Sequence, residues 1–159
     1  MNGPAYCGEV ASVRRTRIIE AAPQTVWDVL ADFGSISSWA ANVDHSCVLE
    51  NGPDGPTIGT SRRVQTGRTT LVERITGFSA PNTLSYGIEG LPRRLGRLAN
   101  RWDVRPAAEG RTEVTLTSTV EIGTGPLAHG TERLVCRAMA RQSEAMLTGL
   151  ARKMEVSRE

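Results

Sequence analysis

The sequence of 159 residues is poor in the large aromatic residues that usually fill much of a protein core. It holds three Trp, two Phe and two Tyr, or 4% of the chain. Its interior must therefore be built mainly from Val, Leu, Ile, Ala and Met. Because these side chains bury less area each than an aromatic ring, the composition permits an internal cavity without proving one.

Cysteine and histidine are too few to build several common kinds of site. The three cysteines, Cys7, Cys47 and Cys136, are odd in number and irregularly spaced, so they indicate neither a disulfide framework nor a zinc signature. The two histidines, His45 and His129, cannot make a histidine-based metal site by themselves. No glycine-rich phosphate loop is present either. We therefore expect no metal and no cofactor.

The chain also lacks an excess of one charge and a long apolar run. Nineteen basic and 17 acidic residues give a formal net charge of +2, so the total charge gives no argument for binding to nucleic acid or to an anionic membrane. No apolar run approaches the roughly 20 residues of a membrane-spanning helix, and the N-terminus lacks a signal-peptide pattern. These absences favour a cytoplasmic protein without an integral membrane segment.

The hydrophobic pattern predicts a strand, a short helix and a turn in the first 40 residues. The strand covers about residues 11–21. Pro23 suits the first turn of a helix, and Val26, Val29, Leu30 and Phe33 follow at helical spacing. Gly34 ends this helix, and the segment after it is long enough for a single further turn.

The rest of the chain is predicted to form strands and then one long helix. Turn sequences such as NGPDGP and SAPN make short links between segments of strand character, which indicates an antiparallel sheet. A pattern of three- and four-residue steps then predicts one helix from Pro126 to Met154. We expect a flexible tail over residues 1–11 and a single domain over 12–155. The predicted strands cover residues 42–50, 60–66, 69–78, 83–89, 98–105 and 112–122.

Alternation along the strands turns a few polar side chains toward the apolar inner face. In VDHSCVL, His45 shares a face with Val43, Cys47 and Leu49, and in LVERI, Glu73 shares a face with Leu71 and Ile75. Apolar walls with a few polar groups are the usual make-up of a small-molecule site. For Glu73 an ion pair with Arg62 or Arg63 is an equal alternative. The same alternation turns inward Leu84, Tyr86, Asn100, Trp102, Leu116 and Ser118.

The order of elements resembles the helix-grip fold of the START-like (SRPBCC) superfamily, which includes polyketide cyclase/dehydrase and lipid-transport proteins. The resemblance covers about Ser12 to Arg152. It rests on IIEAAPQTVWDVLADFGSISSWAANV, IGTSRRV, LVERITGFSAPNTLSYGIEGLP and RWDVRPAAEGRTEVTLT. It implies an α+β fold in which a curved antiparallel sheet of about seven strands wraps around the long C-terminal helix, with two short helices after the first strand.

The resemblance also implies a cavity of several hundred Å³ between the sheet and the long helix. We expect it to hold an apolar small molecule such as a lipid, an isoprenoid or a polyketide. The alternative is a polyketide cyclase or aromatase in which His45 and Glu73 act as acid and base. A homodimer is left open. The expected ligand-binding residues are Trp39, at the cavity mouth or packed in the core, with His45, Leu71, Glu73, Leu84, Tyr86, Asn100, Trp102, Leu116, Ser118, Met139 and Met146.

Overall fold

The computed structural model describes residues 9–92, 96–122 and 128–159. Its elements follow the predicted order closely, and the strand bounds differ from the predicted ones by a few residues at most. In chain order the elements are β1 (Glu9–Ile19), α1 (Pro23–Ala31), the 3-10 helix η1 (Phe33–Ser38), β2 (His45–Glu50), β3 (Ser61–Thr66), β4 (Thr69–Ser79), β5 (Thr83–Glu89), β6 (Arg97–Pro106), the short 3-10 helix η3 (Ala108–Gly110), β7 (Thr112–Ile122) and α2 (Ala128–Val156).

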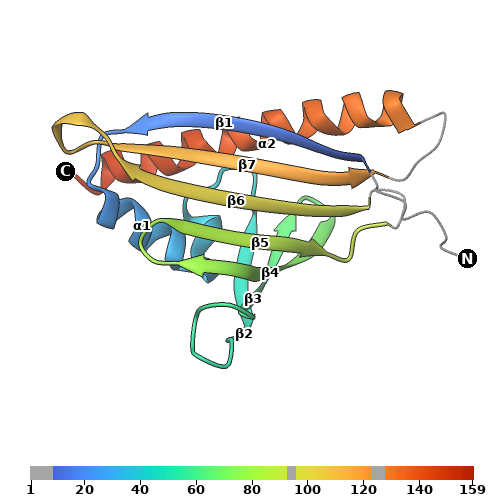
Figure 1. The fold of residues 1–159 in the computed structure, drawn as a ribbon. Coiled ribbons are helices and arrows are strands. Elements are labelled where there is room, and N and C mark those ends of the chain that lie inside the picture. The colour runs from blue at the N-terminus through green and yellow to red at the C-terminus, as the bar shows by residue number, and fades with distance from the viewer. Residues whose placement is uncertain (1–8, 93–95, 123–127) are drawn as a thin grey trace, which may run out of the picture.

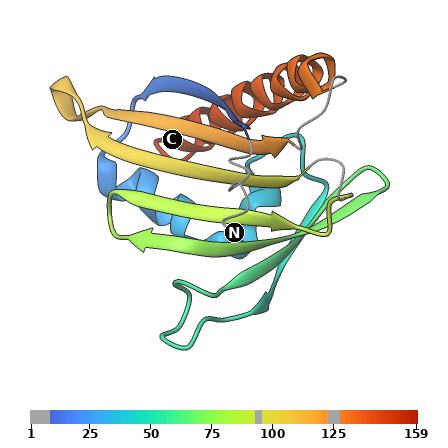
Figure 2. The ribbon, with the colours of Figure 1, turned by 45° about the vertical axis from the view of Figure 1, so that its right-hand side comes forward.

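The seven strands form one antiparallel sheet in the order β1-β7-β6-β5-β4-β3-β2. The sheet is curved, and α2 lies along its concave side beside β1 and β7, while α1 and η1 cover the same side at the other end (Figures 1 and 2). In Figure 1, β2 and β3 turn steeply away from the direction of β5, β6 and β7. This is the predicted helix-grip fold.

The start of the first strand differs from the sequence-based expectation. Strand β1 begins at Glu9, so residues 9–11, expected in the tail, belong to the sheet. Residues 1–8 of that tail, and the predicted helix start at Pro126, lie outside the described residues. Among the residues that are described, no helix is both long and apolar enough to cross a membrane.

The aromatic rings of the first helices pack edge-on against rings of the sheet. Ring centroids are 5.3 Å apart for Trp27 and Phe78 and 5.5 Å apart for Phe33 and Tyr86. The third pair, Trp39 with the sheet residue Trp102, is 6.0 Å apart. Each such pair adds about 0.5–1.5 kcal/mol to the effect of area burial. The six aromatic rings of the described residues are thus concentrated at one end of the concave face, where they fill the core.

The prediction that His45 points inward is wrong. His45 and Cys47 are exposed, whereas Ser46 lies on the inner face opposite the buried Val64. The Ser46 hydroxyl donates to the carbonyl of Gly34 at 2.7 Å and accepts from the backbone N–H of Ser37 at 3.0 Å. These bonds to η1 satisfy a polar side chain on the inner face of an edge strand. A shift of one residue exchanges the two faces of a strand, so Cys47 and Leu49 are exposed as well.

Candidate functional site

A small cavity lies between the middle of α2 and the inner face of β5, β6 and β7. Its volume is about 50 Å³, against the several hundred Å³ that the sequence led us to expect. A space of this size holds a water molecule or two but no lipid. Among the residues that the structure describes, no cavity of several hundred Å³ is found between α2 and the sheet. The lining residues are Ile88, Leu98, Asn100, Ser118, Met139, Gln142, Ser143 and Met146, and we refer to this space as the sheet–helix cavity.

A chain of hydrogen bonds runs along one side of the sheet–helix cavity. The Ser118 hydroxyl donates to Asn100 Oδ1 at 2.6 Å, and Asn100 Nδ2 donates to the Tyr86 hydroxyl at 3.3 Å. Ser143 Oγ of α2 lies 3.3 Å from Ser118 Oγ. Because the Ser118 proton goes to Asn100, Ser143 is the donor in that contact. The network thus joins α2 to the strands at the cavity wall.

Tyr86 forms the deep end of this network. Its side chain is 1% exposed, and its hydroxyl also accepts a bond from Trp102 Nε1 at 3.4 Å. Burial raises the pKa of Tyr86, and the nearby negative charge of Glu73 raises it further. The phenol is therefore held neutral, as a hydrogen-bonding group and not a charge.

Glu73 faces inward as predicted, and it pairs with Arg62. Both side chains are buried, and two guanidinium nitrogens of Arg62, Nε and Nη2, each lie 2.6 Å from Glu73 Oε2. Arg62 Nη1 donates to the carbonyl of Phe33 at 2.7 Å, and its guanidinium carbon lies 3.8 Å from the centre of the Phe33 ring. The ion pair that was one of the two alternatives is present, and together with the bond to Phe33 it links η1 to β3 and β4.

The structure does not bring the proposed acid and base together. His45 is exposed on the outer face of the edge strand β2, while Glu73 is buried on the inner face of β4. Among the described residues, the buried side chains that can titrate are Arg62, Glu73 and Tyr86. The His45 imidazole therefore lies on the opposite face of the sheet from the Glu73 carboxylate.

Four of the predicted ligand-binding residues line the sheet–helix cavity: Asn100, Ser118, Met139 and Met146. Gln142 and Ser143 line it too, although sequence reasoning missed them. The sequence could have identified Gln142 and Ser143, because at helical spacing they share one face with the predicted residues Met139 and Met146. The remaining predictions except His45 are inner-face residues away from the cavity lining: Trp39, Leu71, Glu73, Leu84, Tyr86, Trp102 and Leu116.

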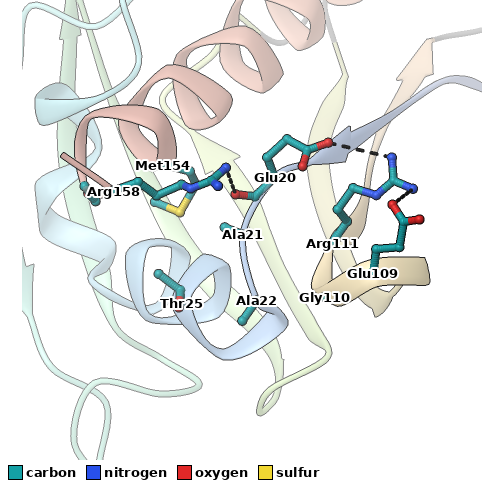
Figure 3. Close-up of a pocket in the computed structure, with 10 residues that line it drawn as sticks. Glu20, Ala21, Ala22, Thr25, Glu109, Gly110, Arg111, Met154 and Arg158 are labelled. Atoms are coloured by element: carbon teal, nitrogen blue, oxygen red, sulfur yellow. Dashed lines mark hydrogen bonds and ion pairs between the residues drawn. The ribbon is translucent and has the colours of Figure 1, made fainter.

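A larger cleft of about 390 Å³ lies on the surface, where the start of α1 meets η3 and the end of α2. Figure 3 shows the charged side chains of this cleft, each with a partner among the residues that line it. Arg158 Nη1 donates to the backbone carbonyl of Glu20 at 3.1 Å. Arg111 lies between the carboxylates of Glu20, at 3.7 Å, and Glu109, at 3.2 Å. These paired charges do not suit an apolar ligand, so we take the sheet–helix cavity as the candidate site.

Another hollow, of about 460 Å³, lies on the outer face of the sheet. Charged side chains border it, among them Arg74 and Glu89, which pair at 2.9 Å. Within the described part of the chain, no group of three or more His, Cys, Asp or Glu side chains is placed to hold a metal ion.

Comparison with known proteins agrees with this fold. Residues 10–155 match the family model described as polyketide cyclase/dehydrase and lipid transport. No curated protein matches the sequence. Among solved structures, the Zhui aromatase/cyclase from Streptomyces sp. R1128 superposes with a TM-score of 0.77 at 20% identity, covering 95% of this chain and 97% of that one. A START superfamily protein from Mycobacterium smegmatis gives 0.71 at 16% identity, covering 91% and 97%.

A third structure, a protein from Thermus thermophilus, gives a TM-score of 0.74 at 19% identity, and the match covers 94% of this chain and 100% of that one. At these identities the likeness establishes the shared fold. It leaves ligand and reaction to be argued from the residues of this chain.

Proposed function

The chain belongs to the polyketide cyclase/dehydrase and lipid transport family, and from that premise we propose that it binds and carries a neutral hydrophobic small molecule between α2 and the sheet. The observation that carries the proposal is the sheet–helix cavity, with apolar walls and a hydrogen-bonding cluster at one side. The cluster offers hydroxyl and amide groups that can bond to a ligand oxygen.

Charge decides which hydrophobic molecules fit. None of the side chains that line the sheet–helix cavity is charged. Arg62 and Glu73, the buried ions of the inner face, already neutralise each other. A carboxylate or phosphate in this space would lose its hydration without gaining an opposite charge, which is very unfavourable. Alcohols, ketones and quinones suit the lining, whereas ionised fatty acids do not.

Binding requires the closed cavity to expand, and the structure of α2 suggests how. From Ser143 onward the helix buries one face against the core, including Met146 and Leu150. Residues 131–142 are exposed or only partly buried. Segments with few buried apolar contacts open at low free-energy cost. We propose that α2 moves outward as far as Ser143, while the part from Met146 onward stays in place, and that the flexible side chains of Met139 and Met146 adapt to the ligand.

Binding and transport of a ligand without any reaction suit the site better than polyketide cyclase chemistry. General acid–base catalysis needs a positioned group with a pKa near the working pH. Glu73 is committed to Arg62, the pKa of Tyr86 is raised, and His45 is exposed on the outer face. Product formation from a poly-β-ketone mimic would contradict this part of the proposal.

The test is a calorimetric titration with 1-decanol and with decanoate at pH 8, where decanoate is ionised. We expect decanol to bind at least about tenfold more tightly than decanoate, because only the carboxylate must be buried as a charge. Met146→Trp should weaken decanol binding by filling the cavity. Leu134→Trp adds the same ring on the exposed side of α2 and should leave the affinity unchanged. Absence of decanol binding up to its solubility limit would refute the proposal.

A further inference from the structure

The outer side of α2 carries a stripe of arginines. Arg133, Arg137 and Arg141 recur every four residues, so they lie on one face of the helix, and all three are exposed. At 1.5 Å per residue the stripe is about 12 Å long. No ion pair involving these three arginines is found within the described part of the chain. Their charges are therefore concentrated on a small area, although the net charge of the chain is only +2.

Two acidic residues, Glu132 and Glu144, flank the stripe of three arginines. Glu144 follows the stripe along the helix, and its carboxylate is held by Arg15 of β1 at 3.2 Å. Leu134 stands beside the stripe with 67% of its surface exposed, and Ala138, one turn further, is exposed as well. In Figures 1 and 2 this half of α2 runs along the margin of the sheet with its outer side open.

We propose that this face of α2, Arg133, Leu134, Arg137, Ala138 and Arg141, docks on an anionic lipid bilayer. Exposed arginines are attracted to acidic headgroups, and a large apolar side chain beside them can enter the boundary between headgroups and acyl chains. Nucleic acid fits this surface less well, because none of its five residues is aromatic and able to stack on a base.

The position of the arginine stripe would place a docked bilayer close to the sheet–helix cavity. The same segment of α2 presents Met139, Gln142 and Ser143 to the sheet–helix cavity on its opposite face. A bilayer that holds the outer face of this segment therefore lies one helix diameter from the cavity. The docking inference rests on exposed charge and does not depend on the proposed ligand, so either can fail alone.

The test is sedimentation of the full chain with vesicles of phosphatidylcholine that contain about 30% phosphatidylglycerol, or none. We expect binding only to the anionic vesicles, with a strong decrease as salt is raised. A surface arginine contributes about 1 kcal/mol at an anionic membrane, and about 1.4 kcal/mol is tenfold in affinity. Arg133→Gln, Arg137→Gln and Arg141→Gln combined should therefore weaken binding about 100-fold.

A matched control variant distinguishes the effect of the arginine stripe on vesicle binding from the effect of the net charge. Arg63, Arg68 and Arg105 are also exposed but lie outside α2, and changing these three to Gln lowers the net charge by the same amount. This control should bind within about threefold of wild type. Leu134→Ser should weaken binding about tenfold. Equal losses in both triple variants, no binding by wild type, or preference for an oligonucleotide of equal charge over the vesicles would each overturn the inference.

Discussion

Replacing Glu73 with leucine would leave the Arg62 guanidinium buried without its carboxylate. Removing one member of a buried ion pair typically costs about 3–5 kcal/mol of stability. Arg62 would keep its bond to the Phe33 carbonyl and its place over the Phe33 and Tyr86 rings, so we expect the lower end, about 3 kcal/mol. Arg62→Met would strand Glu73 and also deprive that carbonyl of a donor, which adds about 1–3 kcal/mol. We expect about 5 kcal/mol for that variant.

The double variant should be much less damaged than the single ones suggest. With both charges gone, the remaining losses are the Phe33 carbonyl bond and the cation–π contacts. Apolar packing offsets these in part, since replacing a buried pair by hydrophobic residues is often neutral or stabilising. We expect the double variant within about 2 kcal/mol of wild type, so that the two single losses exceed the double loss by at least about 3 kcal/mol.

The assay is urea unfolding at pH 7, followed by circular dichroism. Glu89→Leu is the matched control, because it breaks the half-exposed pair with Arg74 at 2.9 Å and should cost less than about 1 kcal/mol. If Glu73→Leu also cost less than about 1 kcal/mol, or if the two single losses simply added, the picture of a desolvated, coupled pair would be refuted.

Two further predictions concern the packing around this site. Gly149→Ala should lower the free energy of unfolding by more than about 2 kcal/mol in urea, although alanine has the higher helix propensity. The reason is that the new Cβ would lie 2.2 Å from the carbonyl oxygen of Trp39. An unchanged or raised stability would show that α2 does not approach that carbonyl. Because the pKa of Tyr86 is raised, the folded state keeps the phenol proton at a pH above about 10, where the unfolded state loses it. The contribution of the neutral phenol to the free energy of unfolding is therefore complete below about pH 10 and is lost as the pH rises further. Tyr86→Phe should flatten this alkaline decline in the free energy of unfolding, and an identical decline in both proteins would contradict the assignment.

Much of the fold was predictable because local patterns and tertiary structure agree. The turn sequences and the alternating strands mark the sheet, and the three- and four-residue steps mark α2. Alternation also placed Glu73, Asn100 and Ser118 on the inner face, where the structure has them. It failed at β2 because an edge strand can turn Ser46 inward when η1 supplies its hydrogen bonds.

The size of the cavity was not predictable in the same way. The composition gives the number of aromatic residues but not where their rings lie in the folded protein. Trp39, which could equally have lined a pocket, instead packs on Trp102, and Phe33 packs on Tyr86. Net charge likewise averages over the surface, so it conceals the local row formed by Arg133, Arg137 and Arg141. The size of the cavity depends on which segments meet in space, whereas the arginine row follows from a four-residue spacing within α2.

The central claim, that a ligand enters by separating α2 from the sheet, is tested most directly by locking the two together. Ser118 Oγ and Ser143 Oγ are 3.3 Å apart across the cavity, so cysteines at these positions are placed to form a disulfide. In a chain with serine at the three native cysteine positions, the oxidised double variant should bind decanol at least about 100-fold more weakly than the same protein after reduction. Equal affinity of the oxidised and reduced forms, with free-thiol titration showing the bond complete, would contradict the account.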